Sequence, residues 1–308
     1  MNPVPPDEAI AFGDAARSAF ESLGGVDLAR SAETDGDVRQ RALTTLERLG
    51  VPDLDVLGDA DSLAAAVELC REAGRVVLPA PAAAMCTGGV VAIDATTPVV
   101  DHGDLLPEWA GVDVATGVVT AYVADGSRFA SRLGPFATAM KATDRATGVD
   151  SHLGTAWMVL SGAVLLGVVD RAIELALDHV RNREQFGQKI SEFQAVQFQI
   201  ADAVTAAKGL RELVNFTAWR VSIDIDASIS DAMALRVYAL DTARAVLRTT
   251  QQLHGASGMC DEYDISILVR HAQPYLRLPF GVERTVDVLD AAVRTHGFAG
   301  LFPHGGRR

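Results

Sequence analysis

Apolar residues recur at helical spacing through the first third of the chain. Residues 7–24 repeat apolar positions three or four apart and stop at a Gly24-Gly25 pair, which predicts a helix with a glycine stop. Two amphipathic segments, near 38–49 and 61–74, also end at glycine. We therefore expect this region to be mostly helical.

The pattern changes between Val76 and about Phe136. Glycine and proline separate short β-branched runs there, of which Val90–Ile93 and Gly117–Val123 are the clearest. Such runs predict strands in a small, loop-rich section. The section is too short for a full doubly wound sheet.

The last half returns to long helical patterns. Apolar residues keep three-four spacing over 155–180 and from Phe193 to Val214, and two more segments follow near 230–254 and 283–296. Four long helices with short connections are typical of an antiparallel bundle. The chain is predicted to be mainly α, with an N-terminal helical domain (1–80), a middle β section (81–150) and a C-terminal four-helix bundle (151–308).

Charge separates the two halves of the chain. The 308 residues carry 27 Lys+Arg and 40 Asp+Glu, a net charge of −13. Residues 1–150 hold 11 basic and 23 acidic side chains, whereas residues 151–308 hold 16 and 17. A net negative chain without a basic cluster argues against nucleic-acid binding and against anionic membrane surfaces. We expect any polyanionic ligand to bind the second half.

The cysteine spacing and the length of the apolar runs argue against a disulfide-rich, a zinc-binding or a membrane-spanning protein. Cys70, Cys86 and Cys260 are far apart, which encodes neither a disulfide framework nor a zinc site, and His254 and His271 lack a third metal-type partner in register. The start does not resemble a signal peptide, and the longest apolar run, 156–169, is shorter than the roughly 20 residues that cross a bilayer. We expect a cytoplasmic protein with no membrane span and no metal.

Two segments could carry chemistry. Residues 181–194 combine three cations, a glycine, an aromatic residue and a glutamine that opens the next helix. Arginine suits bidentate pairing with a pyrophosphate, and helix N-termini attract anions. The alternative is an Arg-rich turn between two helices, which spacing alone favours. The second segment, Gln251–Met259, holds two glycines three apart where a helix is expected to stop, and glycines would also allow close approach of a ligand.

These segments resemble motifs of the acyl-CoA dehydrogenase family. Arg183-Glu184-Gln185-Phe186-Gly187, followed by Phe193-Gln194, is similar to its Arg-x-x-Phe-Gly … Phe-Gln motif. Residues 252–258 resemble its Gln-x-x-Gly-Gly-x-Gly segment, and Arg270-His271-Ala272 its Arg-Asp-Ala. The order and helical context match over about residues 151–300. The N-terminal helices fit the family's helical domain more loosely.

The resemblance implies an acyl-CoA dehydrogenase-like fold, FAD as cofactor and assembly as a dimer of dimers. In the family, the Arg-x-x-Phe-Gly loop of one subunit holds the adenosine diphosphate part of the flavin bound by its neighbour. Ala256 stands where the family has a second glycine. Carried over, the cofactor-binding residues are Arg183 on the pyrophosphate, Phe186 and Phe193 against the flavin, and Gln194, Gln252 and the Gly255 backbone as hydrogen-bond partners, with Gln185 and Ala256 beside them.

The catalytic base of the family has no evident counterpart. Desaturation of an acyl thioester needs a carboxylate to remove the α proton while the flavin accepts the β hydride. The family's usual glutamate position falls on Pro279 here, and the position used by some members falls on about Trp157. Glu283 lies four residues beyond Pro279 and is a weak candidate for a displaced base. Its place at the start of a helical pattern favours a capping or surface role.

The middle section also departs from the family, because its flavin-ring elements have no counterpart in residues 76–136. This asymmetry resembles the short, non-catalytic subunits of actinobacterial heteromeric dehydrogenases that act on steroid-CoA. We therefore expect an α2β2 heterotetramer in which a full-length partner supplies the base, holds most of the acyl-CoA and passes electrons to an external acceptor. Two alternatives stay open: a self-sufficient homomeric enzyme that uses Glu283, and a non-catalytic scaffold or binding protein.

Overall fold

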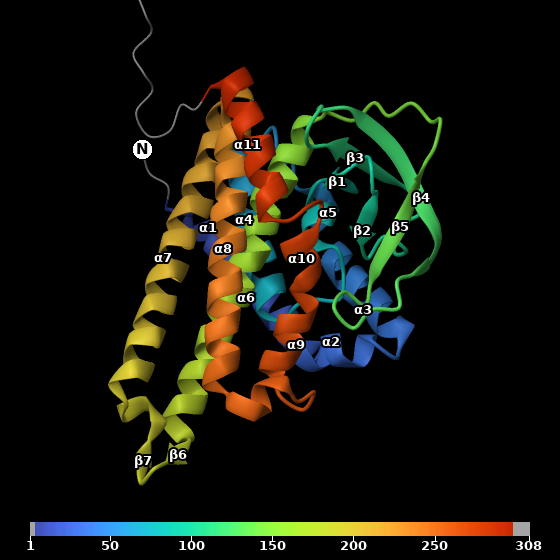
Figure 1. Ribbon diagram of the computed structural model, residues 1–308. Helices are drawn as coiled ribbons and strands as arrows, with labels where there is room; N and C mark the ends of the chain where they lie inside the picture. The colour runs from blue at the N-terminus through green and yellow to red at the C-terminus, as the bar shows by residue number, and fades with distance from the viewer. Residues whose placement is uncertain (1–3, 298–308) are drawn as a thin grey trace, which may run out of the picture.

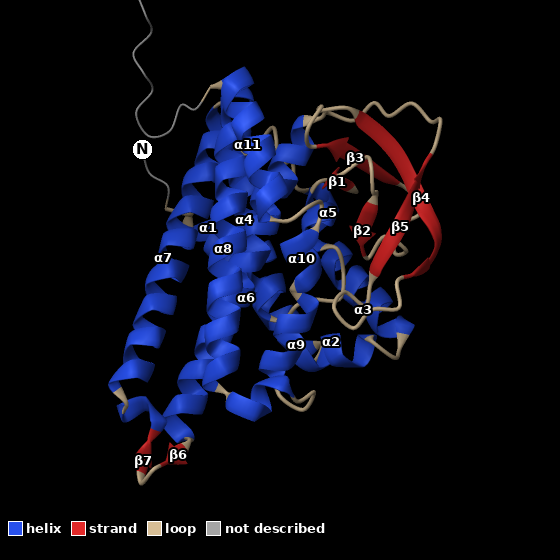
Figure 2. Ribbon diagram, viewed as in Figure 1, coloured by secondary structure: helices blue, strands red, loops and turns tan. Residues whose placement is uncertain are grey.

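Helices make up most of the protein, which a computed structural model describes over residues 4–297 (Figure 1). Figure 2 shows long helices gathered on one side and a small sheet on the other. The prediction of a mainly α chain is confirmed. Residues 1–3 and 298–308, at the ends of the first and last predicted domains, lie outside the described residues. The α-helices are α1 (Asp7–Ser22), α2 (Val26–Ala32), α3 (Gly36–Arg48), α4 (Ala60–Arg75), α5 (Ala82–Cys86), α6 (His152–Asn182), α7 (Gln194–Ile223), α8 (Ile229–Leu253), α9 (Asp264–His271), α10 (Gln273–Arg277) and α11 (Val282–His296).

Helix α6 is the centre of the molecule. It contacts α4, α7, α8 and strand β1 (Val90–Ile93), and every residue from Gly154 to Val169 is buried. This enclosure explains why its sequence is apolar all round rather than on one stripe. By length and composition α6 could cross a membrane, and it is the one such helix in the described part of the chain. However, 83% of its most apolar window is buried inside the protein, as in the core helix of a soluble fold.

Two glycines let α4 and α6 touch backbone to backbone. A Cβ added at Gly167 on α6 would lie 1.8 Å from the carbonyl oxygen of Arg71, and one added at Gly74 on α4 would lie 2.0 Å from that of Val164. Neither position has room for any side chain. The small residues therefore set how closely the N-terminal helices approach the bundle.

A buried charge network strengthens the same contact. Glu72 on α4, with a 1% exposed side chain, accepts hydrogen bonds from Arg17 of α1 at 2.8 Å and forms ion pairs with Arg71 and Arg75. Three guanidinium groups around one carboxylate satisfy a charge that would otherwise be costly to bury. Arg75 also pairs with Glu174 of α6 at 2.8 Å, so the network joins both α1 and α6 to α4.

The middle section forms one five-stranded sheet beside the bundle (Figure 2). Its order is β1-β3-β4-β5-β2, with β1 parallel to β3 and the remaining neighbours antiparallel. At Gly154, where a Cβ would lie 2.8 Å from the Cβ of Val112, α6 packs closely against β3. The other strands are β2 (Val99–Asp101), β3 (Trp109–Asp113), β4 (Val119–Arg128) and β5 (Ala137–Ala142).

Helix α9 is tied to the N-terminal helices by Glu33, the residue after α2. Its carboxylate accepts a hydrogen bond from His271 at 2.8 Å and pairs with Arg270 at 2.9 Å. These hydrogen bonds, His271's first, lower the pKa of Glu33 to about 2, although burial opposes the shift. The pair thus holds together segments more than two hundred residues apart in sequence.

Substituting Gly167 should lower the free energy of unfolding more than substituting an exposed glycine. Gly167→Ala places a methyl group against the Arg71 carbonyl and must push α4 and α6 apart, which we expect to cost at least about 2 kcal/mol of the free energy of unfolding. Gly36→Ala is the matched control, because its added Cβ meets nothing within 4 Å. Denaturant unfolding of both variants measures the difference, and equal stabilities would contradict the close contact.

The pairing of Glu33 with His271 and Arg270 should make the free energy of unfolding depend on pH. Because the folded pKa of Glu33 lies near 2, below its ordinary value of 4.5, its contribution is full above about pH 4.5 and is lost as the pH falls through 2. We expect Glu33→Gln to destabilise the protein at pH 7 and to do so less at pH 3, in denaturant unfolding at each pH. A stability difference that does not change with pH would show that Glu33 carries no such pairing.

Candidate functional site

A two-residue hairpin turn joins α6 to α7 at one end of the bundle (Figure 1). Strands β6 (Glu184–Gln185) and β7 (Gln188–Lys189) pair around Phe186 and Gly187, which have φ angles of 55° and 83°. Left-handed angles at both central residues are those of a type I′ turn. Phenylalanine rarely adopts this conformation, which marks Phe186 as a place to look for function.

The side chains predicted to bind a cofactor in this segment face solvent. Phe186 is 91% exposed and meets the half-buried Phe193 edge-on, with 6.2 Å between ring centroids. Arg183, Gln185 and Gln194 are exposed as well. Arg183 has no ion-pair partner within residues 4–297, so its guanidinium is available to an anion.

The second predicted segment follows the end of α8. Gly255 has φ 61°, and a Cβ added there would meet nothing within 4 Å, so its backbone is open to a ligand. Gln252 and Ala256 are exposed beside it. Gly258 is buried for a structural reason, because an added Cβ would lie 2.5 Å from the Gln251 carbonyl.

The structure brings the two segments together. His179, one turn before Arg183 on α6, lies against His254 at the end of α8, with 4.5 Å between ring centroids. An unpaired guanidinium, an exposed aromatic ring and an open glycine backbone therefore share one end of the bundle. This set suits a diphosphate joined to a flat ring system, since guanidinium groups and free backbone N–H groups bind phosphate oxygens and an aromatic side chain stacks on a ring.

The positions predicted for a base lie at the opposite end of α6. Trp157 is buried near the start of that helix, and Pro279 is buried in the connection between α10 and α11. Arg236 of α8, only 2% exposed, donates hydrogen bonds to the Leu278 and Phe280 carbonyls at 2.6 and 2.8 Å. A fixed loop and a tryptophan, neither able to accept a proton from carbon, thus occupy these positions.

Glu283 lies on the surface in the first turn of α11. It is not among the residues that line the cavity beside Trp157. A carboxylate in the first turn of a helix interacts favourably with the helix dipole. Its location fits the capping or surface role better than that of a base.

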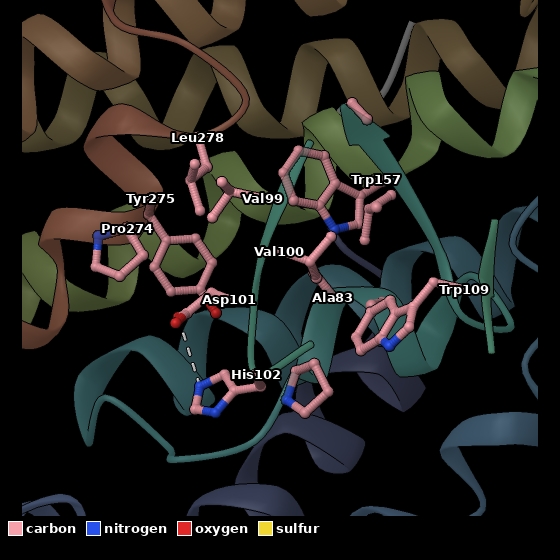
Figure 3. A pocket seen from close by; sticks show the side chains of 14 residues that line it. Ala83, Val99, Val100, Asp101, His102, Trp109, Trp157, Pro274, Tyr275 and Leu278 are labelled. Carbon is pink, nitrogen blue, oxygen red and sulfur yellow. Dashed lines mark ion pairs between the residues drawn. The ribbon is translucent and has the colours of Figure 1, made fainter. Parts of the chain in front are cut away.

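Figure 3 shows the cavity beside Trp157. It has a volume of about 40 Å³ and is bounded by α5, β1, β2, α6 and α10. Most lining residues are apolar, and Asp101, His102 and Tyr275 lie together on one side. At about 10–15 Å³ for each molecule, the space holds two or three waters, not an acyl chain or a tricyclic ring.

Asp101 and His102 were not predicted as site residues. Asp101 Oδ2 lies 3.5 Å from His102 Nε2, whereas Oδ1 is buried with no hydrogen-bond partner among residues 4–297. Burial raises the pKa of Asp101 to about 7 and lowers the pKa of His102 well below its ordinary value. The sequence signal for these two residues was their position directly after a β-branched run. From sequence alone that position is typical of a turn, and only the fold brings Tyr275 of α10 beside it.

Comparison with known proteins agrees with this arrangement. Residues 159–278 match a family model described as acyl-CoA dehydrogenase, C-terminal domain. Acyl-CoA dehydrogenase FadE28 of Mycobacterium tuberculosis is 29% identical over 134 residues, which cover 44% of this chain and 39% of that protein. The matched regions span between 28% and 39% of the curated relatives.

Solved structures resemble nearly the whole chain. A variant of the Tcur3481-Tcur3483 steroid ACAD has a TM-score of 0.77 at 19% identity, covering 94% of this chain and 98% of that one. The ChsE4-ChsE5 complex from Mycobacterium tuberculosis has a TM-score of 0.75 at 17% identity, covering 96% and 99%. The predicted acyl-CoA dehydrogenase-like fold is confirmed. Residues 159–278 thus match the C-terminal domain of the acyl-CoA dehydrogenase family, and the described chain has the fold of that family.

Proposed function

We propose that this protein is a non-catalytic subunit of a heteromeric, flavin-dependent acyl-CoA dehydrogenase. It completes the FAD site of a full-length partner, which contributes the glutamate base. The observation that carries this proposal is that one end of α6 presents a diphosphate-binding set, while at the other end Trp157 and Pro279 occupy the two positions predicted for a base. The chain has kept the part of the site that acts on a neighbour and lost the part that would act on its own substrate.

The length of α6 supports binding in trans. Arg183 and Trp157 are 26 positions apart on a continuous helix, which at 1.5 Å per residue separates them by about 39 Å. A dinucleotide cannot span this distance. A flavin whose diphosphate contacts Arg183 therefore cannot also reach the cavity beside Trp157 in the same chain.

The residues fit one half of FAD and not the other. Arg183, Phe186, Phe193, Gln194, Gln252 and the Gly255 backbone suit the adenosine diphosphate part, because their polar groups are unpaired or open and their rings are accessible. A cavity of about 40 Å³ does not admit an isoalloxazine ring. Because the flavin-ring elements of the family also have no counterpart in residues 76–136, we propose that the partner holds the ring.

The start of α7 supports contact with another chain. The apolar pattern of this helix predicts burial from Phe193 onward, yet the first of its residues to be buried is Ala203. Val196 and Ile200 are half-buried, and Phe198 is 60% exposed. An apolar face continuous with the diphosphate-binding set is suited to a partner surface.

The mechanism divides between the two subunits. FAD, when bound, supplies the acceptor for the hydride that leaves the β carbon of the acyl thioester. A glutamate of the partner would remove the α proton. In this chain Arg183 would neutralise the diphosphate, Phe186 and Phe193 would pack against the bound FAD, and the Gln194 and Gln252 amides would hydrogen-bond it.

The substrate class and assembly are part of the same proposal. One structural neighbour is described as a steroid ACAD and another as a two-component complex. We propose an α2β2 heterotetramer with one FAD per heterodimer, acting in the cytoplasm on a bulky, steroid-derived acyl-CoA. Electrons would leave to a separate acceptor protein.

Co-production with the partner should decide between a heteromer and a self-sufficient enzyme. We expect the chain purified alone to be colourless, and the complex with a co-expressed full-length acyl-CoA dehydrogenase to be yellow and active. Flavin absorbance per protein and acyl-CoA-dependent reduction of a dye measure both states. An isolated chain that holds stoichiometric flavin and loses dye reduction on Glu283→Gln would establish the homomeric alternative instead.

Arg183→Ala should weaken FAD binding by the complex. Removing one charge-assisted pair costs about 1.5–3 kcal/mol, or roughly 10- to 100-fold in the dissociation constant. Arg181→Ala is the matched control, because Arg181 is also exposed and unpaired within residues 4–297 but lies in the last turn of α6. Equal flavin content in the Arg183→Ala and Arg181→Ala complexes would remove Arg183 from the site.

A further inference from the structure

Two imidazole rings join the two halves of the proposed diphosphate site. His179 on α6 and His254 at the end of α8 lie with 4.5 Å between centroids and 31° between ring planes. His254 is 7% exposed, and its Nδ1–H donates to the Thr250 carbonyl at 2.7 Å. That bond fixes the orientation of the His254 ring against His179.

The rings lie next to both binding segments in the chain. His179 lies in the last turn of α6, and the backbone N–H of Arg183, the residue that directly follows the helix, donates to the His179 carbonyl at 2.9 Å. His254 directly precedes Gly255, whose backbone is open to a ligand. The contact between the two rings therefore links the end of α6, next to Arg183, to the end of α8, next to Gly255.

Without an anion, the surroundings disfavour a proton on the pair. Burial lowers the pKa of His179, and the neighbouring His254 and the Arg183 guanidinium lower it further. These two neighbours reach His179 from the end of α8 and from the residue that directly follows α6. A diphosphate beside Arg183 would reverse the sign of the local field.

We propose that His179 and His254 form a proton-linked positioning pair, which fixes the two halves of the diphosphate site and takes up one proton from solvent when the cofactor's diphosphate binds. This inference rests on the proposed function. The pair shares at most one added proton, because two adjacent imidazolium rings repel each other. By linkage, a group that gains a proton on binding makes affinity rise as the pH falls.

The test measures binding rather than turnover. The complex with its full-length partner is stripped of flavin, and FAD is titrated by fluorescence quenching from pH 6 to pH 8. We expect affinity to be several-fold higher at pH 6 than at pH 8, because one pKa unit of coupling sets an upper limit of about tenfold. ADP, which lacks the flavin ring, should show the same trend. Calorimetry in buffers of different ionisation heat should show net proton uptake on binding.

Variants separate proton linkage from simple packing. His179→Phe keeps a ring without a titrating group, and His254→Asn keeps a donor for the Thr250 carbonyl. Both should reduce the pH dependence to less than about twofold, in complexes whose thermal unfolding matches the wild type. His152→Gln is the control, because His152 lies at the opposite end of α6. It should leave the pH dependence unchanged.

The outcomes distinguish this inference from the proposed function. Wild-type complex that binds FAD with no pH dependence, or variants that keep the full dependence, would overturn the proton-linked pair and leave the proposed function standing. A complex that binds no FAD, or binds it equally well after Arg183→Ala, would overturn the proposed function.

Discussion

The contact between α4 and α6 controls the rest of the structure. Gly74 and Gly167 bring two backbones together where no side chain fits, and the Glu72 network closes over the same joint. Because α6 is held rigidly there, the positions of both its ends are fixed. One end lies beside the sheet, and the other leads to the β6–β7 hairpin (Figure 1). The proposed separation of binding from catalysis rests on the length of this one helix.

The long helices could be predicted because their apolar spacing repeats over many turns, and the expected stretches match α1, α3, α4, α6, α7, α8 and α11 closely. Shorter elements could not. α2, α9 and α10 are five to eight residues long, and β2, β3 and β5 three to six. At that length periodicity is weak, and tertiary contacts decide the conformation. Glu33, for example, connects α2 to α9 through a pair that no local pattern contains.

The diphosphate-binding segments could be predicted from the sequence, whereas the polar residues of the cavity beside Trp157 could not. The segments around Arg183 and Gly255 stood out because a turn and a helix stop place unusual residues locally, and the bundle then brings them to one end. Their role in binding stays a prediction. Asp101 and His102 were missed because their burial depends on Tyr275, which arrives from α10 far along the chain. Whether a polar side chain is buried is a property of the assembled fold, not of its neighbours in sequence.

The exposed hairpin also bears on how a cell must make this protein. Phe186 is 91% exposed, Phe198 60% and Met259 72%, and all three lie on the segments at one end of the bundle. An unassembled copy carries these apolar side chains in water, where they favour self-association and capture by chaperones. In the proposed heteromer, balanced synthesis of both subunits would shorten the time that this surface stays uncovered, so the stoichiometry of production would matter as much as the stability of each chain.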